Sequence, residues 1–183
     1  LSVCQKGKWG IINTRLELVV NCLYDEKFIF ENGIAFAHIG DVTDVIDTSG
    51  RLLFSGEFHK INRYDNFNMF VCLSKNRDRF DVYDMLGEFK FSSTSIRSQI
   101  LIPGSQRLSS NCFSPSNIIP ISNKYLKFSI SANYEKRRIV SWGTCDITGS
   151  VIFHAMFDEI GGFGSGLFSV ARKTDKRSYY NNL

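Results

Sequence analysis

Proline, paired cysteines and long hydrophobic runs are all scarce in this sequence, and each shortage excludes a class of protein. The chain has only 3 Pro among 183 residues, so it is neither a proline-rich linker nor collagen-like. Its 5 Cys are odd in number and contain no CxxC pair, which argues against a zinc site and against a dense disulfide framework. No apolar run approaches the length of a membrane span.

An excess of one charge is also lacking. The chain carries 22 Lys and Arg against 18 Asp and Glu, a formal net charge of +4, and the charges are spread along it. A nucleic-acid partner is therefore not expected. Unpaired cysteines favour buried thiols in a reducing compartment, which points to the cytoplasm. Because the chain opens at Leu1 and not at Met, the lack of a signal peptide says nothing about export.

Aromatic residues and glycine are abundant. The sequence has 16 Phe and 14 Gly, a composition that favours short strands joined by tight turns over helices. Hydrophobic residues at 43% and charged residues at 22% are typical of a globular domain. With 183 residues the chain can form one domain with a sizeable core.

An internal repeat organises the whole chain. A shift of 133 residues, the separation of Trp9 and Trp142, places Trp142-Gly143 on Trp9-Gly10 and continues without a gap for about thirty residues. A shift of 34 residues places Val45-Ile46-Asp47 on Ile11-Ile12-Asn13, and a third start is found at Phe80. The chain is therefore expected to be one domain, 1–183, of four units at 8–42, 43–79, 80–141 and 142–176, with partial units at 1–7 and 177–183.

Each unit has the pattern of three short strands. The first strand ends at an Asp or Asn in every unit, and a Gly follows three residues later in three of them, which predicts a β-hairpin. These positions are Asn13, Asp47, Asp84 and Asp146, and Gly50, Gly87 and Gly149. Three short strands cannot bury their own apolar faces, so neighbouring units must stack. We therefore predict an all-β fold in which units of about 34–37 residues form a solenoid-like or curved array. The alternative is a propeller-like ring, which the partial units could close by pairing.

The unit resembles the WG repeat, a bacterial β-repeat named for its Trp-Gly pair. Residues Lys8-Trp9-Gly10-Ile11-Ile12-Asn13 and the stretch from Trp142 to Val170 carry the resemblance best, and it covers nearly the whole chain outside residues 93–121. Only two starts keep Trp-Gly, and the family's Pro after the second strand is missing. The resemblance implies a repeat scaffold, often present in many copies and attached to other domains. It implies no catalytic residues and no cofactor.

Two groups of polar residues are candidates for chemical sites. Asp47, Asp84 and Asp146 could converge as the paired carboxylates of a glycosidase, but a turn position repeated in each unit has a structural explanation. If each carboxylate only caps its own hairpin, the hydrolase hypothesis loses its basis. The three His residues occupy different places in the unit, so no metal site is expected.

The segment 93–121 is the one stretch that the repeat does not explain. It is rich in Ser, Asn and Pro and contains Arg97, Arg107 and Phe113. An insertion on a rigid scaffold is a typical place for recognition, so these three residues are the candidate contacts with a protein partner. The segment is either a binding loop or an eroded repeat packed into the core.

The function expected from these observations is that of a non-catalytic β-repeat scaffold that mediates protein–protein interaction, as a piece of a larger protein. The alternative is a carbohydrate-binding or glycoside-hydrolysing β-repeat protein that uses its turn carboxylates. The sequence predicts no cofactor and no metal.

Overall fold

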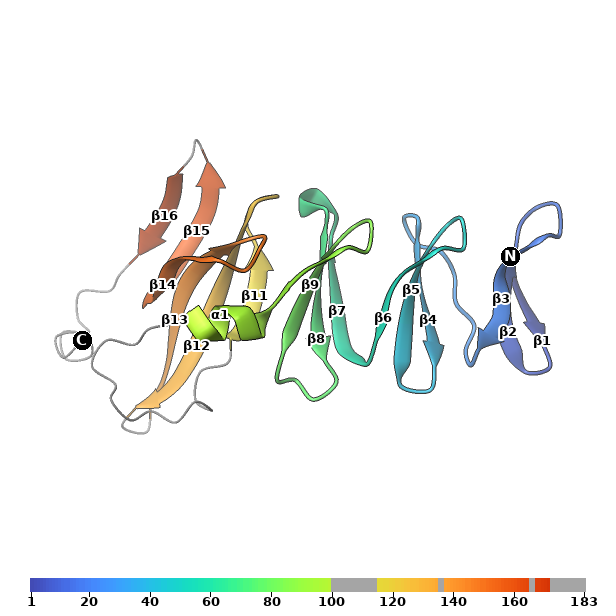
Figure 1. Ribbon diagram of the computed structural model, residues 1–183, viewed down its shortest axis with the longest axis horizontal. Coiled ribbons are helices and arrows are strands. Elements are labelled where there is room, and N and C mark those ends of the chain that lie inside the picture. Colours follow the sequence, from blue (N-terminus) through green and yellow to red (C-terminus); the bar gives the residue numbers. More distant parts are fainter. Residues whose placement is uncertain (100–114, 135–136, 165–166, 172–183) are drawn as a thin grey trace.

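Small antiparallel β-sheets follow one another in a row along the molecule (Figure 1). The computed structural model describes residues 1–99, 115–134, 137–164 and 167–171. The strands and helices are β1 (Ser2–Gln5), β2 (Lys8–Ile12), β3 (Leu18–Tyr24), β4 (Ile34–Ile39), β5 (Val42–Asp47), β6 (Leu52–Gly56), β7 (Phe58–Tyr64), the 3₁₀ helix η1 (Asp65–Phe67), β8 (Met69–Ser74), β9 (Phe80–Asp84), β10 (Phe89–Ser92), α1 (Ser93–Gln99), β11 (Pro115–Pro120), β12 (Tyr125–Tyr134), β13 (Arg137–Asp146), β14 (Val151–Phe157), β15 (Glu159–Gly164) and β16 (Leu167–Ala171).

The sheets are out of phase with the sequence units, by one strand in the first two sheets and by two strands in the third and fourth. The first sheet has the order β1-β2-β3 and the second β4-β5-β6. The third is β10-β9-β8-β7, the fourth β11-β12-β13-β14, and β15 and β16 form the fifth. In the second sheet, β4 ends one sequence unit whereas β5 and β6 begin the next. The second, third and fourth sheets thus join the last one or two strands of one unit to the first hairpin of the following unit.

The hydrophobic core is divided into layers that lie between successive sheets. Because side chains alternate along a strand, each sheet has one face toward its N-terminal neighbour and one toward its C-terminal neighbour. Ile11 and Val20 of the first sheet pack with Ala35, Ala37 and Ile46 of the second. Two further clusters fill the second-to-third and third-to-fourth layers in the same way. Stacking therefore buries what a single unit would leave exposed.

Turn glycines set how closely these sheets approach one another. A Cβ on Gly50, in the second sheet, would lie 2.1 Å from the carbonyl oxygen of Val19 in the first. A Cβ on Gly87, in the third sheet, would lie 2.4 Å from the carbonyl oxygen of Leu53 in the second. Both glycines also have positive φ, +86° and +87°, which L-residues with a side chain rarely adopt. The predicted turn glycines are therefore needed twice, for the turn and for the stack.

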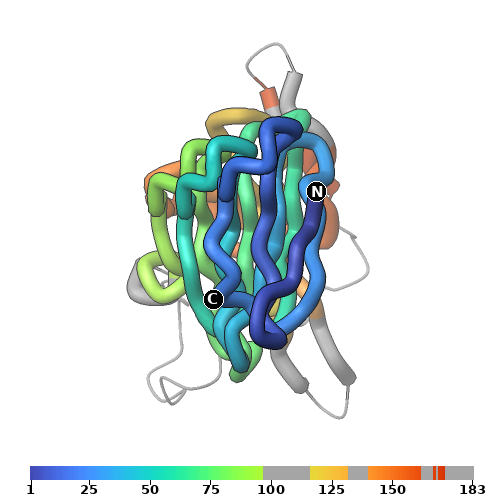
Figure 2. The backbone as a smooth tube through the Cα atoms, turned by 90° about the vertical axis from the view of Figure 1, so that its right-hand side faces the viewer, coloured from blue at the N-terminus to red at the C-terminus, as the bar shows by residue number. Residues whose placement is uncertain are grey.

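The predicted all-β array is confirmed. Across the described ranges the sheets form no closed barrel or ring, so the propeller-like alternative is not observed. Figure 2, a view along the array, shows the second strands of successive hairpins, β3, β6 and β10, on the same side. In this part of the chain no helix is long and apolar enough to cross a membrane.

The described parts of segment 93–121 belong to the scaffold. Helix α1 follows β10 directly, and its Ile96 is buried in the core between the third and fourth sheets. Strand β11 pairs with β12 in the place that β7 holds beside β8, and its Ile118 is buried in the same core. These two ends therefore fit the reading of an eroded repeat, whereas residues 100–114 lie outside the described ranges.

Candidate interaction surface

The hairpin turns between the first and second strands of the units share one hydrogen-bond pattern. In each, the side-chain Oδ1 of the Asx residue accepts bonds from the backbone N–H groups two and four residues later, at 2.8–3.1 Å. The backbone N–H of the same Asx residue donates to the carbonyl four residues later, at 2.9–3.0 Å. These residues are Asn13, Asp47, Asp84 and Asp146. The Asx position is therefore a structural cap in every unit.

The electrostatics of the turn carboxylates agree with this capping role. A hydrogen bond from the Ser49 hydroxyl, at 2.5 Å, is the main cause that lowers the pKa of Asp47. Burial opposes ionisation of Asp146, but bonds from Thr148 and from backbone N–H groups still lower its pKa. A glycosidase instead needs one carboxyl group with a raised pKa as its acid. Since each carboxylate caps its own hairpin, the hydrolase hypothesis loses the convergence on which it depended.

The glycine of the Trp-Gly pair is explained by a close backbone approach. A Cβ on Gly10 would lie 2.4 Å from the carbonyl oxygen of Val20, and one on Gly143 would lie 2.5 Å from that of Phe153. In both places the pairing with the second strand shifts register, between Trp9 and Ile11 and between Trp142 and Thr144. The pair is thus a bulge site and not a chemical site.

The two units that lack Trp-Gly carry an aspartate at the glycine position, Asp44 and Asp81. Here the aspartate is itself paired with the second strand, Asp44 with Ser55 and Asp81 with Ser92, and the register shift lies farther along the hairpin. Asp44 accepts hydrogen bonds from the Tyr24 hydroxyl at 2.9 Å and the Ser55 hydroxyl at 2.5 Å. Asp81 is buried and accepts from the Arg79 guanidinium at 2.9–3.0 Å. Asp44 thus links the first sheet to the second through Tyr24, whereas Asp81 forms an ion pair within the third sheet.

The remaining polar and thiol groups do not gather into a site within the described ranges. No three of the described His, Cys, Asp and Glu residues lie close enough together to hold a metal ion. His38 is hydrogen bonded through Nδ1 to Thr43, at 3.1 Å. Of the cysteines in this part, Cys72 and Cys145 are buried free thiols as expected, but Cys4 is a free thiol on the surface.

The candidate contact residues of segment 93–121 are distributed as follows. Arg97 lies in helix α1, beside the buried Ile96. Arg107 and Phe113 lie outside the described residues. None of these three side chains is among those that the structure describes, so their role stays a prediction.

A row of exposed apolar side chains runs along the array, and the sequence analysis missed it. The residue five positions after each turn Asx is apolar, and in the first three units it is Leu18, Leu52 and Phe89. Each of these is 52% exposed. Phe89 also rests edge-on against Tyr83, with ring centroids 5.5 Å apart. We call these three residues the apolar row. Their equal spacing from the turn was the available signal.

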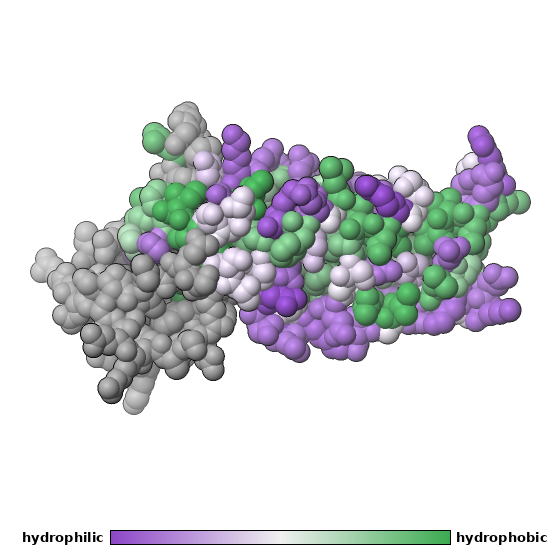
Figure 3. All heavy atoms as spheres, in the orientation of Figure 1, coloured by the Kyte–Doolittle hydropathy of each residue, from purple (hydrophilic) through white to green (hydrophobic). Residues whose placement is uncertain are grey.

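The apolar row lies on strands that form one edge of their sheets. β3, β6 and β10 are each the terminal strand in the strand order, so they present backbone groups that no neighbouring strand pairs. Figure 3 shows hydrophobic residues above each of the first three sheets, between hydrophilic residues along the rims. The row therefore combines apolar side chains with open strand edges.

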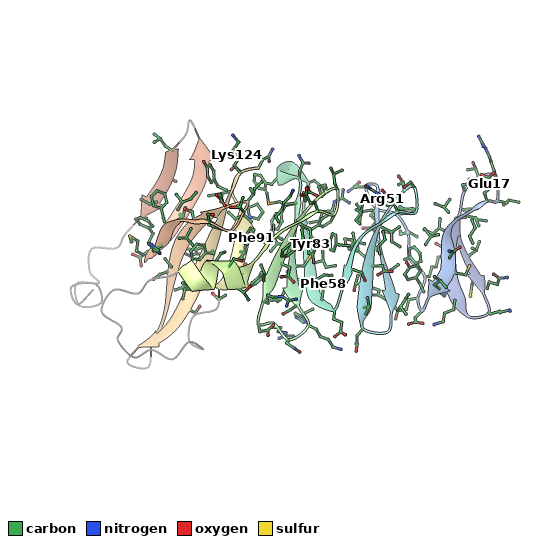
Figure 4. The ribbon with its side chains drawn as sticks, in the orientation of Figure 1. Glu17, Arg51, Phe58, Tyr83, Phe91 and Lys124 are labelled. Atoms are coloured by element: carbon green, nitrogen blue, oxygen red, sulfur yellow. The ribbon has the colours of Figure 1, made fainter. Side chains whose placement is uncertain are left out.

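The charges at the turn rim beside the row are paired with one another. Arg51, which Figure 4 labels at the upper rim, donates to Asp47 at 3.0 Å. Lys90 lies between Asp84, at 2.8 Å, and Glu88, at 2.7 Å. Because these pairs compensate each other, the rim has no strong field of one sign, and apolar contact is the main attraction that this side offers.

One family model, described as the WG containing repeat, matches two segments of the chain, residues 9–41 and 142–176. No curated protein matches the chain.

Proposed function

We propose that this chain, in which residues 9–41 and 142–176 are WG containing repeats, is a non-catalytic scaffold that binds a protein partner along the apolar row. The supporting observation is that Leu18, Leu52 and Phe89 occupy the same position in successive units and are equally exposed. Exposed apolar groups arranged over a long surface favour association with another protein.

The row offers two kinds of contact to such a partner. Leu52 and Phe89 provide anchors that lose water on binding, and because each is already about half buried, burying the rest of one such side chain contributes about 1 kcal/mol. The open edges of β6 and β10 provide N–H and C=O groups for an extended segment of the partner. The rigid stack holds these groups at fixed spacing, which lowers the entropy lost on binding.

The test is capture of a binding partner from the native host by the wild-type chain, followed by calorimetry with the purified pair. The double variant Leu52→Ser with Phe89→Ser is expected to weaken binding by about tenfold or more, because apolar anchors contribute more than about 1 kcal/mol each when they are hot spots. Ile29→Ser is the matched control, since Ile29 is also exposed, at 58%, but lies outside the row. Unchanged affinity of the double variant would refute the proposal.

Segment 93–121 is tested in the same assay as a second contact region. The triple variant Arg97→Ala, Arg107→Ala and Phe113→Ala is preferable to deletion, because Ile96 and Ile118 are part of the core. Weaker binding by this variant would extend the surface to the insertion. Unchanged binding would remove these three residues from the interaction.

A further inference from the structure

The first sheet leaves one apolar face open to solvent. The backbone groups of Leu1 and Ile12 exchange two hydrogen bonds, at 2.8 and 2.9 Å, so the two residues lie directly opposite each other. Ile12 is also paired with Leu18, and Val3 with Gly10. Residues that pair in this way project from the same face of a sheet. Leu1 is 80% exposed and Leu18 is 52% exposed. We call this surface, Leu1, Val3, Ile12 and Leu18, the end face.

The same positions are buried in the second sheet. A shift of 34 residues carries Leu1 to Ala35, Val3 to Ala37 and Ile12 to Ile46, and these residues are 0%, 1% and 1% exposed. What covers them is the opposite face of the first sheet, through Ile11, Val20 and the aromatic residues near them. The end face of the first sheet is thus equivalent to the face by which the second sheet stacks on the first.

The third and fourth sheets continue this series. In the first sheet, Ile12 precedes the turn residue Asn13 and lies opposite Leu1. The residue opposite the equivalent position is Phe70 in the third sheet and Leu126 in the fourth. Both are fully buried. Each sheet that follows another sheet therefore buries this face against its predecessor, and all the residues concerned are apolar, as Leu1 and Val3 are.

The C-terminal side of the fourth sheet has a different chemistry. Lys127 stands where the third sheet has Val71, and the buried Thr144 stands where it has Val82. The Lys127 ammonium donates to the carbonyl of Ile160 in β15, at 2.9 Å, and lies over the Trp142 ring. This polar side is already covered by β15 and does not match the end face, so the fourth sheet of a second copy is not the expected occupant.

We propose that the end face is a stacking surface for one further β-sheet of the same repeat, which presents to it an apolar side like the one that the first sheet presents to the second. This contact shares only Leu18 with the apolar row, and its other residues, Leu1, Val3 and Ile12, lie at the end of the array and not along its side. The occupant is identified by its chemistry: a small sheet whose facing strands carry Ile, Val and aromatic residues.

The test uses the intact chain lengthened by one unit. A copy of residues 1–34 is placed before Leu1, so that Ile34 precedes Leu1 as it now precedes Ala35. We expect hydrogen exchange of the Ser2–Gln5 and Lys8–Ile12 backbone amides to slow by about tenfold or more, and the midpoint of thermal unfolding to rise. We also expect Val3→Asp to be tolerated in the original chain but to lower that midpoint in the extended one, where Val3 becomes buried. Ala37→Asp is the control and lowers the midpoint in both chains.

Three results would overturn the proposal. One is unchanged exchange in the extended chain together with a harmless Val3→Asp in both chains. Another comes from a second extended chain that also carries Leu1→Ala and Val3→Ala, so that its junction has the same residues as the contact between the first two sheets. If the Ser2–Gln5 and Lys8–Ile12 amides exchange slowly in this second chain but not in the first extended chain, the natural end face does not stack. The third is sedimentation of the original chain as a dimer that Val3→Asp dissociates, since the occupant is then a second copy.

Discussion

The capping aspartates give the most direct test of how the repeat is held together, and Asp47→Ala is the substitution of choice. Its carboxylate accepts bonds from the backbone N–H groups of Ser49 and Arg51, at 2.9 and 3.1 Å. It also accepts from the Ser49 hydroxyl and the Arg51 guanidinium. Alanine removes this carboxylate, and with it all four bonds, while keeping a Cβ at the same place in the backbone.

The expected loss can be worked out from these contacts. Each of the two backbone bonds is worth about 1 kcal/mol, and the ion pair with Arg51, whose side chain is 59% exposed, adds little. The released N–H groups reach water at the turn, so no further desolvation cost is added. The free energy of unfolding should therefore fall by about 2 kcal/mol, the upper end of the range for lost helix caps. In a chain of this length that corresponds to a fall in Tm of about 4–8 °C.

The matched control is Asp47→Asn, because Asn13 holds the equivalent turn with the same two backbone bonds, at 2.9 and 3.0 Å. This variant should lose less than about 1 kcal/mol. Both variants are measured by thermal unfolding followed by circular dichroism, with hydrogen exchange of the Ser49 and Arg51 amides as the local readout. If asparagine is as damaging as alanine, the capping argument is wrong.

The pH dependence supplies an independent check of the same contact. The pKa of Asp47 is lowered in the folded chain, chiefly by the Ser49 hydroxyl bond, so the ionised group stabilises the fold. This contribution is fully present above the unfolded pKa of about 3.9 and is lost as the pH falls through the lower folded value. The stability difference between the wild type and Asp47→Asn should shrink below about pH 4. A constant difference down to pH 2 contradicts the assignment.

Three further predictions concern the stack, the thiols and an intersheet bond. Gly87→Ala should lower the free energy of unfolding by more than about 2 kcal/mol, because its Cβ meets a backbone carbonyl at positive φ, whereas Gly40→Ala, with nothing within 4 Å, should cost only about 1–2 kcal/mol; urea unfolding compares the two. Burial raises the pKa of the Cys72 thiol, so iodoacetamide at pH 8 should label Cys4 in the native protein and Cys72 only after unfolding, as read by peptide mass spectrometry. Burial, and then the bond to a carboxylate, raises the pKa of Tyr24, so stability is kept below about pH 10 and falls above it; Tyr24→Phe should remove this alkaline loss while costing about 1 kcal/mol at neutral pH, and equal alkaline loss in both proteins would contradict it.

The hairpins could be predicted from the sequence because their cause is local. An Asx side chain reaches N–H groups only two and four residues away, and Gly50 provides the positive φ three residues after Asp47, so the signal lies within five residues. The first unit lacks the glycine of this turn, and Leu16 adopts the positive φ, 63°, at the position where the other units have glycine. Its residues Asn13 and Glu17 nevertheless form the same bonds.

The arrangement of strands into sheets could not be predicted in the same way. Whether β4 closes one sheet or opens the next depends on which neighbour it pairs with, and the repeat period is the same in both cases. The place of β11 in the fourth sheet depends on its pairing with β12, since its sequence lacks the repeat pattern. The role of Asp44 and Asp81 required the pairing register, because it places the register shift away from these two residues and not at them, as it is at Gly10 and Gly143.

The offset between sequence units and sheets bears on how such a chain can lengthen or be cut. A gene duplication with its boundary before Lys8 or Val42 divides the polypeptide between the first two strands of a sheet, β1 and β2 or β4 and β5. Each copied unit is therefore joined to its neighbours by a full ladder of backbone hydrogen bonds as well as by the peptide chain. For the same reason a protease that cleaves at Gly40 leaves two fragments that β4 and β5 still hold together. The borders that are clearest in the sequence are thus among the most strongly joined places in the folded molecule.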